Sequence, residues 1–347
     1  MTNEDKNPLP WMDQREAYEE ALRYISNRRL GKITSLLTAW NSLNKVTVNG
    51  LEWHNTIVIG ARPGGGKTLM KDQLIRDLFV LNPLANFQVL EFEFEMLSTV
   101  KCLRSLSSET KRTYRDLCSA DNPLEKEVFD DCVAHARKKL EFPINIRHTP
   151  CTVTRLEEII HQYMEHHSYL KLVDVKDKEG NISKVQKKTY KGTIVSLDHS
   201  NLVRKDKHEK NTLEMLYNLG ETITKLKRMY PITFIILSQL NRDIEHPDRC
   251  QSGTYGNYVL ESDFFGSDAL LQHADVLIGV DKPAKRKITE YGPLRYLIDD
   301  PNLLAVHYLK VRNGEPGMAF FTAKFDTMEV HERQVEPVKI QRKMRNS

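Results

Sequence analysis

The segment 56–68, which reads TIVIGARPGGGKT, constrains the fold of this chain more than any other part of the sequence. An apolar run leads into a glycine-rich turn, and Lys67 and Thr68 then begin a helix predicted over 67–81. Backbone N–H groups of such a turn point inward and bind phosphate oxygens, while the N-terminus of the helix adds positive potential. Lys67 can reach the β and γ phosphates of a nucleotide, and Thr68 can hold magnesium. The sequence therefore predicts a site for ATP and Mg²⁺ formed by Arg62, Pro63, Gly64, Gly65, Gly66, Lys67 and Thr68.

The rest of the chain alternates between short apolar runs and helical segments. After the run at 56–61, further runs lie at 87–95, 193–198, 232–239, 274–280 and 303–311. Alternation of this kind predicts an α/β fold in which helices flank a mostly parallel, twisted sheet. The last two runs could instead pair as an antiparallel edge.

Sequence patterns also divide the chain into parts. The predicted parts are an N-terminal extension with a linker helix over 1–32, an ATPase domain over 33–335 with a lysine-rich hairpin inserted at about 170–192, and a basic tail over 336–347. In the predicted helix, Tyr18, Leu22 and Ile25 share one face. This face could pack on its own domain or on a neighbouring subunit.

Composition narrows the location and the partners of the protein. Lys and Arg number 51 against 47 Asp and Glu, a small excess that permits a nucleic-acid partner without requiring one. The five cysteines lie far apart and show no zinc-binding spacing, which indicates a reducing cytoplasm. The N-terminus lacks the pattern of a signal peptide, and no apolar run approaches the roughly 18 residues of a membrane span. We therefore expect a cytoplasmic protein without a membrane partner.

Two strands end in carboxylates that an ATPase needs. The run at 193–198 ends in Asp198, which can hold magnesium opposite Thr68, although a strand-end aspartate can also cap a turn. Glu91, Glu93 and Glu95 alternate along the run at 87–95 and therefore share one strand face. Glu95 lies nearest the C-terminal edge, where water must be aligned with the γ phosphate, and is the predicted general base. The other two could pair with basic residues, or the strand could be peripheral.

Several blocks of the sequence resemble, in order, the motifs of the DnaB family of replicative DNA helicases. They are the lead-in and nucleotide loop with its Arg62-Pro63 pair, EFEM at 93–96, LDHSNLV at 197–203, LSQLNRD at 237–243 and LKVRNGEPG at 309–317. The resemblance spans about residues 33–318. It implies the fold of a RecA-like P-loop NTPase and the activity of an ATP-hydrolysing DNA helicase.

The resemblance also implies roles for single residues. Glu95 would be the catalytic glutamate, and Gln239 would touch the γ phosphate and report its loss. Lys310 and Arg312 would enter the neighbouring subunit's site, with Arg312 as the arginine finger. A cation supplied in this way couples hydrolysis to subunit motion, because charge develops on the transferring phosphoryl group. Taken alone, both side chains could simply extend to solvent from one strand face.

Ring helicases grip single-stranded DNA with loops that face the pore, so basic loops after the strands that carry the ATP groups are candidate contacts. Arg204 and Lys205 begin a basic loop, and Arg242 lies in a long glycine-bearing segment over 241–258. These three residues are the predicted DNA-phosphate contacts, and the alternative is a solvated run of charge. Phe265 departs from the family pattern, since a basic residue is common at that place.

As a whole, the resemblance implies a hexameric ring that translocates on single-stranded DNA and unwinds a duplex. A primase or a helicase loader is an expected partner. The family's N-terminal helical domain and a fused primase are missing from the sequence, which favours a reduced, phage-encoded motor in the host cytoplasm. The alternatives are a RecA-like filament or loader that binds single-stranded DNA without unwinding, and a regulatory ATPase assembled around a protein partner.

Overall fold

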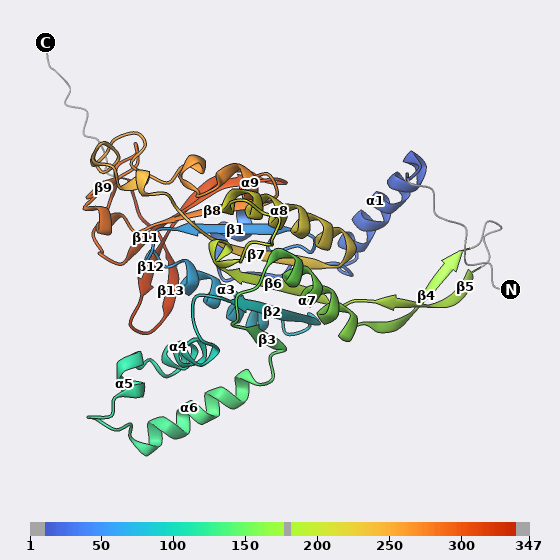
Figure 1. Ribbon diagram of the computed structural model, residues 1–347, viewed down its shortest axis with the longest axis horizontal. Helices are drawn as coiled ribbons and strands as arrows, with labels where there is room; N and C mark the ends of the chain where they lie inside the picture. The colour runs from blue at the N-terminus through green and yellow to red at the C-terminus, as the bar shows by residue number, and fades with distance from the viewer. Residues whose placement is uncertain (1–10, 177–181, 338–347) are drawn as a thin grey trace, which may run out of the picture. The chain divides into compact units, whose positions relative to one another are not determined.

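The computed structural model describes residues 11–176 and 182–337 and contains a nine-stranded sheet (Figure 1). The strand order is β13-β12-β11-β8-β1-β7-β6-β2-β3. The strands are β1 (Thr56–Ala61), β2 (Phe87–Glu93), β3 (Ile144–Arg147), β6 (Gly192–Asp198), β7 (Ile232–Gln239), β8 (Val276–Asp281), β11 (Leu303–Val311), β12 (Gly317–Lys324) and β13 (Glu329–Arg333).

Six of the nine strands run parallel, and β11, β12 and β13 form an antiparallel edge. The predicted α/β fold with a mostly parallel sheet is therefore confirmed. The last two apolar runs form β8 and β11, which pair antiparallel to each other, as suggested. β8, however, is parallel to β1 on its other side. The antiparallel part thus begins one strand later than the runs alone suggest.

Helices cover both faces of the sheet, because successive side chains of a strand point to opposite sides. Val58 joins the core cluster that contains residues of α7 (Val153–His166) and α8 (Thr212–Met229). Ile57 and Ile59 join the cluster on the other face, against α3 (Lys67–Leu81) and α2 (Asn41–Val46). Buried on both faces, the central parallel strands read as almost continuous apolar runs.

A helical excursion leaves the sheet between β2 and β3. It consists of α4 (Ser98–Thr110), α5 (Tyr114–Cys118) and α6 (Lys126–Lys139) (Figure 1). These helices bury only Ser107, Ser108 and Cys132 among their own residues. The remaining short elements are α9 (Ser267–Leu271), β9 (Glu290–Tyr291) and β10 (Tyr296–Leu297).

A two-stranded antiparallel ribbon joins α7 to β6. It is formed by β4 (Tyr169–Lys176) and β5 (Ile182–Thr189), which pair only with each other. Lys171 lies directly opposite Lys187. Large apolar side chains such as Leu172 and Val185 are exposed on this ribbon.

The chain divides into two compact units, Met1–Ser35 and Leu36–Ser347. The first contains α1 (Gln14–Arg29), whose N-cap is Asp13; the Asp13 carboxylate accepts a hydrogen bond from the backbone N–H of Arg15. None of the residues of α1 is buried. Beyond Pro337, the predicted basic tail lies outside the described residues. Among the described helices, none has both the length and the apolar character that crossing a membrane requires.

Candidate ATP site

The phosphate loop connects β1 to α3 and depends on its glycines. Gly64 and Gly66 have φ angles of 68° and 91°, a region that costs residues with a side chain free energy. At Gly65, an added Cβ would lie 2.8 Å from the carbonyl oxygen of Arg62. The loop can therefore bring its backbone N–H groups to the N-terminus of α3, which is the arrangement that binds phosphates.

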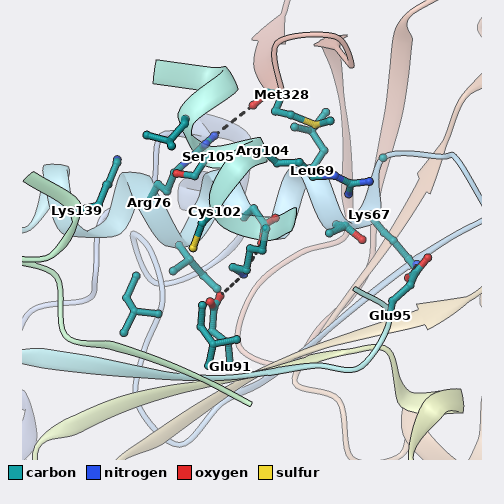
Figure 2. Close-up of a pocket in the computed structure, with 18 of the residues that line it drawn as sticks. Lys67, Leu69, Arg76, Glu91, Glu95, Cys102, Arg104, Ser105, Lys139 and Met328 are labelled. Atoms are coloured by element: carbon teal, nitrogen blue, oxygen red, sulfur yellow. Dashed lines mark hydrogen bonds and ion pairs between the residues drawn. The ribbon is translucent and has the colours of Figure 1, made fainter. Parts of the chain in front are cut away.

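Four polar side chains predicted from separate parts of the sequence meet at this loop. The Lys67 ammonium lies 3.0 Å from a Glu95 carboxylate oxygen (Figure 2). It also lies 3.9 Å from Asp198. Thr68 donates a hydrogen bond of 2.8 Å to Asp198. They converge because β1, β2 and β6 are parallel, so their C-terminal ends share one edge of the sheet.

The donors at this edge fit a magnesium ion. Asp198 is fully buried, and its Oδ1 accepts no hydrogen bond from the described residues. The Lys67 ammonium is 3.9 Å from this oxygen, beyond hydrogen-bond distance, so the oxygen is open to a metal ion, and magnesium prefers oxygen ligands of this kind. Thr68 offers a hydroxyl oxygen beside the same carboxylate. These two residues would hold the ion.

Glu95 is the most accessible of the three alternating glutamates. Its side chain is 46% exposed, whereas Glu91 and Glu93 are buried. Partial burial acts to raise the pKa of Glu95, but the hydrogen bond and charge of Lys67 outweigh it and lower the pKa. Glu95 is thus a carboxylate at neutral pH, as a general base must be.

The two inner glutamates take part in a buried ion network. Lys101 lies 2.8 Å from Glu91 and 2.9 Å from Glu93, and Lys71 is ion-paired with Glu93 and lies 3.0 Å from Asp72. Burial raises the pKa of Glu91 despite the two lysines. The proposed pairing with basic residues is therefore confirmed, and the proposed peripheral position is wrong, because β2 lies between β6 and β3.

A cavity of about 690 Å³ opens from the phosphate loop. Gln239, at the end of β7, lines it together with Lys67 and Glu95. Sequence reasoning missed two further lining residues, Phe325 and Met328, which follow β12. An added Cβ on Gly66 would lie 3.6 Å from the Phe325 ring, so this ring lies against the loop. Only the β12–β13 turn brings it there, and no local motif signals it.

His199 follows Asp198 through a cis peptide bond and is buried. Burial, followed by the charge of Lys67, lowers the pKa of His199 below its usual value. The imidazole is therefore neutral at neutral pH. It adds no positive charge to the carboxylates of the site.

The side chain of Arg62 contacts protein groups rather than the cavity. Its guanidinium donates to both carboxylate oxygens of Glu245, at 2.9 and 3.1 Å, and to the carbonyl oxygen of Leu240 at 2.9 Å. Pro63 of the same loop is also held by the protein: its carbonyl oxygen accepts a hydrogen bond of 2.6 Å from the Lys285 ammonium.

Arg312 and Lys310 lie beside the N-terminal ends of β1 and β8, whereas the phosphate loop follows the C-terminal end of β1. Arg312 is 54% exposed, and its guanidinium lies 3.0 Å from Asp275, which also accepts a hydrogen bond from the backbone N–H of Thr56. Lys310 donates to the carbonyl oxygen of Leu271 at 2.7 Å. Since Thr56 begins β1 and the phosphate loop follows its end, the length of β1, roughly 16 Å, separates Arg312 from its own loop.

The predicted DNA contacts follow the C-terminal ends of neighbouring strands. Arg204 and Lys205 come after β6, Arg242 comes after β7, and all three are exposed. Phe265 is 43% exposed, while its neighbour Phe264 is buried against Gly60. The structure thus leaves all three basic side chains open to solvent.

Comparisons with known proteins agree with this geometry. The family described as DnaB-like helicase C terminal domain matches residues 35–329. One solved ATPase domain has a similar fold, with a TM-score of 0.70 at 18% identity, over 91% of this chain and 98% of that chain. A DnaB-like replicative helicase, solved in a study of its interactions with primase, gives a TM-score of 0.67 at 17% identity, over 91% of this chain and 66% of that one.

None of the curated protein sequences matches the chain. The family match nevertheless spans most of the sequence and includes the phosphate loop, both strand-end carboxylates and Arg312. The two solved structures share the RecA-like fold of this sheet. The chain therefore belongs to the family of DnaB-like helicase C-terminal domains, and it is an ATP-hydrolysing helicase motor.

Proposed function

We propose that six copies of this chain form a ring that hydrolyses ATP between subunits, translocates on single-stranded DNA and unwinds a duplex. One observation carries the proposal: Arg312 lies at the edge of the sheet opposite to the phosphate loop. A side chain of this length does not span the roughly 16 Å of β1. Arg312 therefore cannot reach the ATP of its own subunit, and as an arginine finger it would act on the ATP of a neighbouring subunit.

Each subunit supplies the groups that bind and position ATP. The backbone of 64–66 and the Lys67 ammonium bind the phosphates, and Thr68 and Asp198 would hold magnesium. Magnesium, when bound, neutralises charge on the β and γ phosphate oxygens. Glu95 accepts a proton from the water whose oxygen attacks the γ phosphorus. The bond from that phosphorus to the bridging oxygen breaks, and ADP and phosphate result.

Lys67 connects phosphate binding with the release of Glu95. The Lys67 ammonium is 3.0 Å from Glu95 and holds the pKa of that carboxyl below its usual value. A triphosphate is a stronger partner for Lys67, because it carries more negative charge. Glu95 then loses its partner and is free to take a proton. Gln239, at the end of the adjacent strand β7, would contact the γ phosphate.

The nucleotide base would lie near two apolar residues that line the same cavity, Phe325 and Met328. Phe325 lies against the loop, and Met328 lines the cavity beside it. An aromatic ring can stack on a base without reading its identity. Phe325 is therefore the proposed base contact.

Arg204, Lys205 and Arg242 are the proposed contacts to the DNA backbone, since they are exposed and follow the strands β6 and β7 that carry ATP groups. Phosphate contacts of this kind imply little sequence preference. The exposed Phe265 could add a base-stacking contact at a position where the family often has a positive charge.

The cytoplasm is the proposed location, because all five cysteines are free, as a reducing compartment requires. A primase or a loader remains a predicted partner. The solved DnaB-like helicase described with primase interactions supports a primase for that protein. Phage origin remains a prediction from the sequence.

Mixing two inactive variants tests the shared site. Arg312→Ala removes the finger but keeps the phosphate loop, and Lys67→Ala does the reverse. Each variant alone should lose about 10³-fold or more in DNA-stimulated kcat. In a mixed ring, some seams combine an intact loop with an intact finger. ATP turnover should therefore reappear on mixing and reach a fraction of the wild-type rate.

Arg155→Ala is the matched control, because Arg155 is an exposed arginine whose ion pair with Glu158 lies on α7. It should hydrolyse ATP like the wild type. If the mixture stays inactive while both variants assemble, the finger does not act between subunits. Electron microscopy of the ATP-bound protein completes the test: closed rings agree with the proposal, and open filaments favour a DNA-binding protein that does not unwind.

A further inference from the structure

The outer side of the phosphate loop is joined to the segment that carries a proposed DNA contact. Arg62 donates two parallel hydrogen bonds to Glu245, at 2.9 and 3.1 Å, and a third to the carbonyl oxygen of Leu240 at 2.9 Å. A two-point contact between a guanidinium and a carboxylate fixes orientation as well as distance. Glu245 ends the 3-10 turn Arg242–Glu245, so Arg242 lies three residues away on the same turn.

Two consecutive side chains after β8 make a second connection. The Lys285 ammonium donates to the carbonyl oxygen of Pro63 at 2.6 Å, within the phosphate loop. The next residue, Arg286, donates to the carbonyl oxygens of Ile244 and Asn257, each at 2.6 Å. Arg286 is buried and paired with the buried Asp281, which keeps its position fixed.

The segment between β7 and α9 is itself held as a unit. The Arg249 guanidinium is ion-paired with the buried Asp263 and donates to the carbonyl oxygens of Gly256 and Tyr258 at 2.9 and 2.7 Å. Phe264 anchors its end, because an added Cβ on Gly60 would lie 2.3 Å from the Phe264 ring. Because the segment is held in this way, a displacement of Glu245 should also move Arg242.

We propose that Arg62, Glu245 and Lys285 are positioning residues that couple the phosphate site to DNA binding at Arg242. Triphosphate places negative charge beside the loop, which competes with Glu245 for Arg62 and shifts the turn that carries Arg242. Coupling between two sites is reciprocal, so DNA held at Arg242 must change nucleotide affinity by the same factor. This inference rests on the proposed function, because it requires a DNA contact at Arg242.

Glu245→Gln in the full chain tests the coupling. It removes the charge but keeps the shape of the side chain. The affinity for an oligo-dT strand is measured with and without a non-hydrolysable ATP analogue, and ATP turnover is measured with and without the strand. We expect the ratio of the two DNA affinities, and the stimulation of turnover by DNA, to fall at least threefold. DNA affinity without nucleotide should stay within about twofold of wild type.

Asp248→Asn is the matched control, since Asp248 makes the same change of charge three residues away and is highly exposed. It should leave both ratios unchanged. Glu245→Asp keeps the charge and should restore part of the coupling. Lys285→Met removes the second connection and should also lower the ratio, which keeps the test valid if Glu245→Gln folds poorly.

Wild-type ratios in both Glu245→Gln and Lys285→Met would overturn the inference. So would an equal loss of DNA affinity with and without nucleotide, because that result indicates a purely structural role. A wild-type protein whose turnover does not respond to DNA and which does not bind the strand contradicts the proposed function itself. The two failures are therefore distinguishable.

Discussion

Lys67 has two carboxylates within reach before any phosphate binds: Glu95 at 3.0 Å and Asp198 at 3.9 Å. One ammonium thus faces two carboxylates, so these three side chains carry a net negative charge that suits a metal cation. Close behind them, Lys71 and Lys101 form ion pairs with three carboxylates, those of Glu91, Glu93 and Asp72. Removing one charge from this buried group would therefore affect several partners. Glu95 is different, because it is half exposed and its ion-pair partner among the described residues is Lys67.

Glu95→Gln should separate ATP binding from hydrolysis. The amide keeps the size of the side chain but does not accept the proton of the attacking water. We expect kcat to fall by about 10²- to 10⁴-fold while nucleotide affinity changes little. Steady-state turnover and titration with a fluorescent nucleotide measure the two effects. Glu127→Gln, an exposed glutamate on α6, is the control, and hydrolysis within threefold of wild type in Glu95→Gln would rule out the assigned role.

His307 should make stability depend on pH. It is buried, it hydrogen-bonds the hydroxyl of Tyr291 at 2.9 Å, and burial lowers the pKa of His307 to about 4. Between about 4 and the unfolded value of about 6.5, the unfolded chain binds a proton that the folded chain does not. Stability from this group is therefore full above pH ~6.5 and is lost as pH falls toward ~4, by roughly 3 kcal/mol in total.

Urea unfolding between pH ~7.5 and ~4.5, compared for wild type and His307→Gln, measures this effect. The glutamine still offers Tyr291 a polar partner but does not titrate. Its disadvantage relative to wild type should shrink as the pH falls. Parallel loss of stability in both proteins would show that other groups cause the pH dependence.

Strand-end reasoning brings Lys67, Thr68, Glu95 and Asp198 to one place, because parallel strands share their C-terminal edge and each residue ends or follows an apolar run. It does not find the partner of Arg62 or the ring of Phe325. Glu245 is 183 residues from Arg62 along the sequence, and Phe325 is farther still. Both lie on turns whose course depends on tertiary packing. The roles of the individual site residues stay predictions.

At the scale of elements, the β4–β5 ribbon is separate from the core. Its strands pair only with each other, and Leu172 and Val185 are exposed. By contrast, Ile160 of the preceding helix α7 is completely buried. The two neighbouring elements should therefore respond very differently to change.

Replacing 172–186 with Asn-Gly should leave the fold intact. Lys171 and Lys187 are paired directly opposite each other, so a two-residue turn can join them. We expect Tm to change by less than about 2 °C, because β4 and β5 pair only with each other and their side chains Leu172 and Val185 are exposed. Ile160→Ala, as the comparison, should cost about 2–5 kcal/mol. Thermal unfolding followed by circular dichroism measures both, and a large loss on shortening the ribbon would mean that it packs on something.

The apolar runs predict the parallel strands β1, β2, β6, β7 and β8, since those strands are buried on both faces, but they miss the parallel strand β3, which is partly exposed. They also do not reveal β12, β13, whose only apolar residue is Val330, or where the antiparallel edge begins. Edge strands expose one side and therefore lack a continuous apolar signal. The excursion from α4 to α6 is also not delimited by the runs, which mark strands only.

At the scale of the whole molecule, α1 should act in assembly. Tyr18, Leu22 and Ile25 are 65%, 64% and 60% exposed, although they form one apolar face. If a neighbouring subunit covers this face, Leu22→Ser should weaken subunit association at least tenfold, which corresponds to about 1.4 kcal/mol or more of lost burial. Sedimentation velocity across a concentration series measures this shift.

Glu20→Ser is the control, because Glu20 is an exposed polar residue of the same helix. It should assemble like the wild type. Unchanged assembly of Leu22→Ser would mean that the apolar face of α1 has no partner subunit. A fall in Tm of both variants would instead point to the helix itself.

The assembly proposed for this chain has a direction, because Arg312, the proposed finger, and the phosphate loop lie at opposite ends of β1. In a linear array one end subunit holds ATP that no neighbour can help to cleave. Closing the array removes that idle end. ATP turnover per subunit should therefore rise when the array closes into a ring, so the ATPase rate itself reports ring closure.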